Sequence, residues 1–230
     1  MINQASLDAV AGARLSDQFI RPLYDDYGFT QIPQTVRYCL GASERKGVPF
    51  GPADALYDQY DAVVLLFVDA FGWRFFEQFA DHPLLRRVAG DGLVTKLTSQ
   101  FPSTTAAHVT AIHTGLPPGA SGVFEWFYYE PQLDAIFAPL LFSIAGDRER
   151  ETLRGKIDPA ALFPQHTIYH DLRAHDVDAT LINHQSYARS PYTQQLAGGA
   201  QVEPYRTLPE AFVKLGLLLE RRQRRSYYFL

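Results

Sequence analysis

The apolar run at residues 62–68 is the feature that most constrains the fold of this chain. It reads AVVLLFV, contains β-branched residues, and ends directly before Asp69. A continuous apolar run of strand length is typical of a strand that is buried on both faces of a parallel sheet. We therefore expect a central parallel strand with a carboxylate at its carboxyl end.

Helix and strand signals alternate along the rest of the chain. Gly115 is expected to close a short helix that follows a Pro-containing turn, and the aromatic segment 123–143 predicts strands or a β-hairpin. Further helices are expected at 73–80, 83–88, 166–175 and 208–222, and further strands at 94–98, 179–183 and 226–230. Such alternation predicts an α/β fold, a mostly parallel sheet with helices on both faces.

The chain is expected to have two parts. Residues 1–57 carry mixed helical signals, including the periodic run Leu15–Tyr27, a stop at Gly41 and the Gly/Pro-rich stretch GVPFGPADA. They are interpreted as an N-terminal helical leader packed on the core. Residues 58–230 are interpreted as the α/β domain itself.

Composition limits the classes of partner and compartment. The net charge is −4, so the molecule as a whole has no field that attracts nucleic acid or an anionic membrane. The arginines within 221–225 lie at the carboxyl end of a predicted helix, where cations are ordinary, and are not interpreted as a nucleic-acid patch. Cys39 is the single cysteine, no secretory signal is apparent, and no apolar stretch approaches the roughly 20 residues that span a bilayer. We expect a soluble, cytoplasmic protein.

Two features suggest chemistry, and each has an ordinary structural alternative. Asp69 at a strand end could ligate a divalent cation or could cap the following helix. Ser103, Thr104 and Thr105 stand at a strand-to-helix junction, where a hydroxyl can cap the helix or can attack a phosphorus atom when a metal activates it. A helix N-terminus also attracts phosphate.

A family resemblance favours the chemical interpretation. Asp69 is followed, at residues 101–123, by F-P-S-T-T-A-A-H-V-T-A-I-H-T-G-L-P-P-G-A-S-G-V, and the region Val63–Val123 resembles the type I phosphodiesterase / nucleotide pyrophosphatase branch of the alkaline-phosphatase superfamily. The resemblance implies that Asp69 is a metal ligand and that Thr105 is both the nucleophile and a metal contact. His108 stands where the family has a phosphate-binding asparagine, and is expected to bind substrate in its place.

The resemblance also implies a reaction. Two divalent metal ions, expected to be zinc, would flank the scissile phosphate while Thr105 attacks it, and the substrate would be a small-molecule phosphate ester, an anhydride or a nucleotide. The family continues the strand matching Ser226–Leu230 into a D-x-x-G-H motif and later histidines. We therefore expect an alkaline-phosphatase-like domain truncated at the C-terminus, inactive alone.

Other interpretations stay open. The chain could be a non-catalytic binding or interaction protein. A serine esterase is a weaker alternative, because no G-x-S-x-G sequence occurs. His166 and His170 have the i, i+4 spacing of two metal ligands on one helix, but two histidines are weak evidence for a site.

Overall fold

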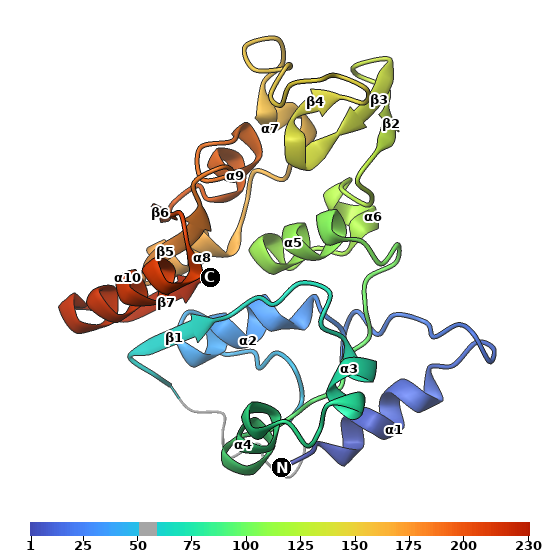
Figure 1. Cartoon of the computed structure of the whole chain (residues 1–230), viewed down its shortest axis with the longest axis vertical. Coiled ribbons are helices and arrows are strands. Elements are labelled where there is room, and N and C mark those ends of the chain that lie inside the picture. The colour runs from blue at the N-terminus through green and yellow to red at the C-terminus, as the bar shows by residue number, and fades with distance from the viewer. Residues whose placement is uncertain (51–58) are drawn as a thin grey trace.

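A computed structural model describes residues 1–50 and 59–230, and a four-stranded parallel sheet lies at its centre (Figure 1). The strand order is β1 (Ala62–Leu65), β7 (Ser226–Phe229), β5 (Asp178–His184) and β6 (Gln201–Tyr205). All three pairs of neighbours run parallel. The carboxyl ends of the four strands therefore meet at one edge of the sheet.

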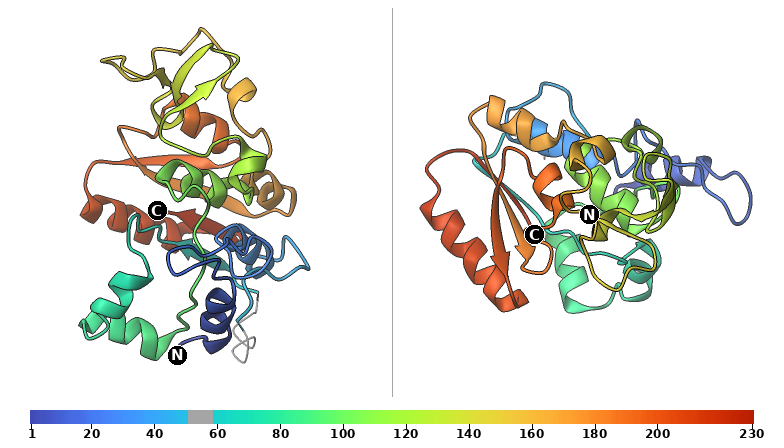
Figure 2. Two further views of the ribbon diagram at one scale, coloured as in Figure 1. Left: turned by 90° about the vertical axis from the view of Figure 1, so that its right-hand side faces the viewer. Right: turned by 90° about the horizontal axis from the view of Figure 1, so that it is seen from above.

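Helices cover both faces of this sheet. Tyr227 and Phe229 of β7 pack in the core formed with α2 (Gln31–Cys39), α5 (Thr105–Thr114) and α8 (Ile168–Ala174). Tyr228, which points to the opposite face, packs with Ala211 and Leu215 of α10 (Leu208–Arg221). Figure 2 shows α10 on one side of the strands and the other helices across from it. The predicted fold class is confirmed, and the architecture is consistent with an alkaline-phosphatase-like fold.

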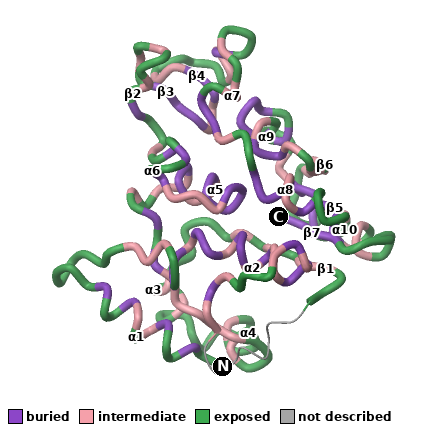
Figure 3. The backbone as a smooth tube through the Cα atoms, turned by 180° about the vertical axis from the view of Figure 1, so that it is seen from behind, coloured by how far each residue is buried: buried purple, intermediate pink, exposed green. Residues whose placement is uncertain are grey.

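The first strand is less buried than its apolar sequence predicts. β1 lies at the edge of the sheet beside β7, and no residue from 59 to 97 is buried within the described chain (Figure 3). Val64 is 37% exposed and Val68 is 68% exposed. The expectation of a strand buried on both faces was wrong, because position in the sheet, which the run itself does not encode, determines how much of a strand is covered.

One N-terminal expectation was also wrong. Residues 15–27 are not helical; instead, α1 covers Gln4–Gly12 and α2 covers Gln31–Cys39. Pro22 interrupts the periodic run, since proline lacks the N–H that a helix interior needs. The stretch GVPFGPADA lies partly outside the described residues, and the boundary predicted between residues 57 and 58 lies wholly outside them.

The segment 94–98 was expected to be a strand of the main sheet and is not. It forms isolated parallel bridges with the N-terminal segment, Ile2 to Val94 and Gly28 to Thr98. Two short helices precede it, α3 (Trp73–Gln78) and α4 (Pro83–Asp91), close to their predicted positions. The N-terminal segment thus supplies the pairing partner of this strand-like stretch.

A second layer forms from the middle of the chain. β2 (Tyr128–Glu130), β3 (Ala135–Ala138) and β4 (Ser143–Ile144) make an antiparallel sheet, which confirms the hairpin predicted within 123–143. Its core contains Phe137, Phe142 and Phe163. The short elements around it are α6 (Pro118–Ser121), η2 (Pro139–Leu141), α7 (Pro159–Leu162) and α9 (Pro191–Leu196). Across both described stretches of chain, no helix combines the length and the apolar character that crossing a bilayer requires.

Candidate active site

Asp69 and Thr105 meet at the carboxyl end of β1. Asp69 follows the strand, and Thr105 is the first residue of α5. The hydroxyl of Thr105 donates a hydrogen bond of 3.1 Å to Oδ2 of Asp69. The other carboxylate oxygen, Oδ1, accepts the backbone N–H of Ala70 at 2.9 Å. The two residues that the sequence singled out are therefore in direct contact, and the carboxylate is exposed to solvent.

The neighbouring hydroxyl residues have different partners. Thr104 is the N-cap of α5: its Oγ1 accepts from the backbone N–H of Ala107 at 3.4 Å and donates to the carbonyl of Phe124 at 3.1 Å. The hydroxyl of Ser103 contacts that of Ser99. Of the three consecutive hydroxyl residues, Thr105 is the one that reaches Asp69.

His108 lies in the first turns of α5, and its ring contacts the backbone of the segment that precedes the helix. Its Nδ1 lies 2.7 Å from the carbonyl oxygen of Thr104, and its Nε2 accepts the backbone N–H of Gln100 at 3.3 Å. Because a carbonyl can only accept, Nδ1 carries the proton and Nε2 is the acceptor. The hydroxyl of Ser99 also lies 3.0 Å from Nε2. In this arrangement the neutral ring has no N–H left for a ligand.

A cavity of about 650 Å³ opens over this region. Its lining includes Asp69, Thr105 and His108 together with Trp73 and Lys96. The sequence alone did not single out Trp73 or Lys96 as site residues. Lys96 lies in a segment whose alternation resembles an ordinary strand, so its sequence carries no signal of a site.

The described residues offer only part of a metal site. Asp69 and Thr105 present two oxygen donors side by side, which suits a hard divalent cation. Zinc sites use three or four protein ligands. Within residues 1–50 and 59–230, no group of three or more histidine, cysteine, aspartate or glutamate side chains is placed to hold a metal ion. These two donors do not complete a metal site by themselves.

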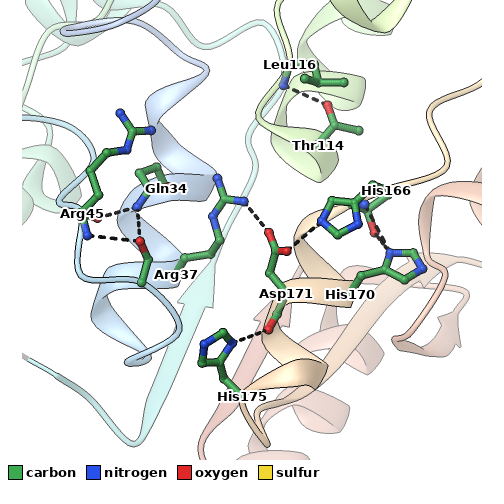
Figure 4. A network of polar contacts seen from close by, with 11 residues as sticks. Gln34, Arg37, Arg45, Thr114, Leu116, His166, His170, Asp171 and His175 are labelled. Carbon is green, nitrogen blue, oxygen red and sulfur yellow. Dashed lines mark hydrogen bonds and ion pairs between the residues drawn. The ribbon is translucent and has the colours of Figure 1, made fainter.

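His166 and His170, the second candidate for metal binding from the sequence, make other contacts in the structure (Figure 4). The rings of His166 and His170 stack with centroids 5.4 Å apart. However, Nε2 of His166 lies 2.7 Å from Asp171, and Nδ1 of His170 accepts the backbone N–H of Thr167 at 3.2 Å. The pair thus belongs to a polar network at the start of α8.

The same network joins α8 to α2. Arg37 of α2 forms an ion pair with Asp171 of α8. Burial acts to raise the pKa of Asp171, but the hydrogen bonds and charges of Arg37 and His166 outweigh it and hold that pKa below its usual value. The contact holds together α2 and α8, two of the helices that cover one face of the sheet.

Comparison with known proteins gives a family match for one segment of the chain. Residues 63–140 match the family model described as type I phosphodiesterase / nucleotide pyrophosphatase, part of the alkaline phosphatase superfamily. That segment is therefore similar to a family of phosphoester hydrolases, and Asp69, Thr105 and His108 all lie inside it. No curated protein and no solved structure matches the chain.

Proposed function

We propose that this protein is a metal-dependent hydrolase of small phosphate esters, anhydrides or nucleotides in which Thr105 is the nucleophile. The observation that carries the proposal is the hydrogen bond from Thr105 Oγ1 to Asp69 Oδ2 at the N-terminus of α5. The family match of the surrounding segment supports it. The single cysteine, Cys39, suits the reducing cytoplasm in which we place the protein.

Asp69 orients the nucleophile. Because the Thr105 hydroxyl proton points to Oδ2 of Asp69, the oxygen lone pairs point elsewhere, toward positions that a phosphorus atom can occupy. In the proposed step, a bond forms between Thr105 Oγ1 and phosphorus, and the bond from phosphorus to the leaving oxygen breaks. The hydroxyl proton of Oγ1 passes to water, and the leaving oxygen departs with the bonding electron pair and takes up a proton from water. Water then hydrolyses the phosphothreonine.

The start of α5 favours negative charge at this position. A helix N-terminus carries free N–H groups and the positive end of the helix dipole. One of these groups, the N–H of Ala107, donates a hydrogen bond to Oγ1 of Thr104. A phosphate that meets Thr105 therefore lies where the helix stabilises its charge, which grows in the transition state.

Metal binding is part of the proposal, although the described residues supply only two ligands. Asp69 and Thr105 would hold one divalent ion in part, with further ligands supplied from outside the described residues. When bound, zinc supplies positive charge that favours the deprotonated hydroxyl. Since two ligands underfill a zinc site, we expect the 230-residue chain alone to have little or no activity.

His108 is proposed to act on substrate through the turn that it holds. Its bonds to Thr104 and Gln100 fix the peptide that leads into Thr105. A direct bond from His108 to a phosphate oxygen, as expected from its place in the family motif, would require the neutral ring to give up its bond to Thr104. That substrate-binding role stays a prediction.

A trapping experiment tests the proposal. A longer form of the protein that supplies the further metal ligands would be incubated with Zn²⁺ and a labelled p-nitrophenyl phosphodiester, quenched in acid, and mapped by mass spectrometry. We expect label on Thr105, none in Thr105→Ala, and a retained fraction in Thr105→Ser, because a primary hydroxyl can perform the same attack. Label on Ser103 or Thr104 would refute the assignment.

The alternative function is a non-catalytic binding protein of the same fold. The incomplete ligand set of the described residues favours it. The same experiment separates the two: a chain that binds phosphate esters but shows no label on any hydroxyl, even with excess Zn²⁺, fits the binding protein.

A further inference from the structure

Lys96 is the basic residue of the cavity that holds Asp69 and Thr105. Among the described residues that line this cavity, it is the only lysine or arginine, and Asp69 is the only carboxylate. Neither a hydrogen-bond acceptor nor a carboxylate partner of its ammonium group is found in the described chain. An unpaired cation and the proposed nucleophile thus share one cavity.

The ammonium group is held over an aromatic ring. Nζ of Lys96 lies 5.2 Å from the centroid of the Trp73 ring, which is cation–π geometry. The indole Nε1 is buried without a hydrogen-bond partner in the described residues. Because Nε1 is enclosed, Trp73 serves as a platform and not as a donor. An ammonium has three N–H donors, and a ring below it leaves them free for an anion above.

The backbone of Lys96 is fixed by the N-terminal segment. Its N–H donates to the hydroxyl of Ser6 in α1 at 2.9 Å, and Ser6 is fully buried. Two residues earlier, Val94 exchanges hydrogen bonds with Met1 and Asn3 of 2.8 and 2.9 Å. A lysine that only needed to reach solvent would gain nothing from this anchoring, whereas one that presents its charge at a fixed place would.

We propose that Lys96, on its Trp73 platform, binds a second anionic group of the substrate, a phosphoryl or carboxylate group distinct from the phosphate that meets Thr105. The proposal rests on the function proposed above, because it places two groups of one substrate in one cavity. It names the substrate class as phosphoric esters or anhydrides that carry another negative charge beyond the scissile phosphate. Esters with an uncharged remainder should bind less tightly.

The test measures binding and needs no turnover. Calorimetry with EDTA present, at fixed ionic strength, would compare 3-phosphoglycerate with glycerol 3-phosphate, which lacks the carboxylate, and would include pyrophosphate as the phosphoryl counterpart. We expect Lys96→Gln to raise the dissociation constants for 3-phosphoglycerate and pyrophosphate about tenfold or more, the size of a lost charged hydrogen bond. The dissociation constant for glycerol 3-phosphate should change little in this variant.

Matched variants make the result specific. Lys96→Arg keeps the charge and should retain most of the affinity, and Lys156→Gln, an exposed lysine outside the cavity lining, should behave as wild type. In a Trp126→Phe background Trp73 is the only tryptophan, so its fluorescence should respond to pyrophosphate and stop responding in Lys96→Gln. Without ligand, the emission maximum of Trp73 should be the same with and without the Lys96→Gln change, which shows that the variant is folded around Trp73.

Several outcomes would overturn the inference. One is that neither pyrophosphate nor 3-phosphoglycerate binds, and another is that Lys96→Gln and Lys156→Gln lose the same affinity for them. A third is that Lys96→Gln loses as much affinity for glycerol 3-phosphate as for 3-phosphoglycerate, which would place the scissile phosphate itself on Lys96. Thr105→Ala distinguishes this failure from that of the proposed function. The preference for 3-phosphoglycerate over glycerol 3-phosphate should survive in Thr105→Ala, whether or not Thr105 becomes labelled in the trapping experiment.

Discussion

The hydroxyl of Thr105 donates to the carboxylate of Asp69 across 36 positions of sequence, at a distance of 3.1 Å. One residue follows an edge strand and the other begins a helix, so the contact depends on how β1 and α5 are placed relative to each other. This pairing gives a solvent-exposed carboxylate and a helix-terminal hydroxyl a shared position from which to act on a phosphate.

Asp69→Asn should weaken metal binding without weakening the fold. Asp69 is exposed, so loss of its charge should change the free energy of unfolding by less than about 0.5 kcal/mol. Loss of a charged ligand should raise the dissociation constant for Zn²⁺ about tenfold or more, measured by calorimetry. Asp81→Asn, an exposed aspartate outside the cavity lining, is the control. Equal Zn²⁺ affinity in Asp69→Asn and wild type would count against the metal role of Asp69.

Thr104→Ala should mainly lower stability, whereas Thr105→Ala should mainly abolish labelling. Thr104 caps α5, so its loss should lower the free energy of unfolding by about 0.5–2 kcal/mol, measured by urea denaturation. Labelling of Thr105 should persist in that variant. Thr105→Ala should cost less stability and lose all label. The assignment fails if Thr105→Ala is the more destabilised variant and still carries label.

His108→Ala should loosen the turn that precedes Thr105. Loss of the bonds to Thr104 and Gln100 should lower the free energy of unfolding by about 1–3 kcal/mol, because the backbone groups that remain are partly shielded from water. Amide exchange of Gln100, followed by NMR, should become faster than in an exposed-histidine control, His82→Ala. A variant with unchanged stability but weaker phosphate binding would instead indicate that His108 contacts substrate directly.

Stability should fall below pH 6.5 through His113. Burial lowers the pKa of this histidine from 6.5 to about 4, and its Nδ1 lies 2.7 Å from the hydroxyl of Tyr169. Between pH 6.5 and about pH 4 this histidine is protonated in the unfolded chain but not in the folded chain, so the free energy of unfolding falls as the pH is lowered. The loss should reach about 3 kcal/mol near pH 4, since each pKa unit corresponds to about 1.4 kcal/mol.

His113→Gln provides the comparison for this pH dependence. Urea titrations from pH 7 to pH 4 should show a shallower decline for His113→Gln than for wild type, whereas His82→Gln should keep the wild-type slope. Parallel curves for wild type and His113→Gln would show that this histidine does not govern acid stability.

Ala70 holds a backbone conformation that favours glycine. Its φ is +59°, and its N–H donates to Oδ1 of Asp69. Ala70→Gly should be neutral or stabilising by up to about 1 kcal/mol, because relief of left-handed strain offsets the greater freedom of the unfolded chain. Ala70→Val should destabilise by more than about 1 kcal/mol, since β-branched residues rarely adopt this conformation. Ala80→Val, at a position without positive φ, should cost less, and thermal melts would compare the three variants.

Sequence patterns determined the elements whose signals are local. Gly115 ends α5 with a φ of +75°, as its position after the helix predicted, and the aromatic segment forms the antiparallel sheet. The apolar periods of 208–222 and 226–230 predicted α10 and β7 closely. Local chemistry was enough in these cases, because capping, turn conformation and side-chain period all act within a few residues.

The tertiary structure decided what depends on distant neighbours. The run at 62–68 specified a strand, but not that it lies at the edge of the sheet with Val68 exposed. The alternation of 94–98 predicted a sheet strand, yet pairing with Ile2 and Gly28 took that segment to the N-terminal side. Lys96 came to face the cavity through this pairing. A segment's sequence fixes which surfaces it offers, whereas the partner that covers each surface is chosen by the packing of the whole chain.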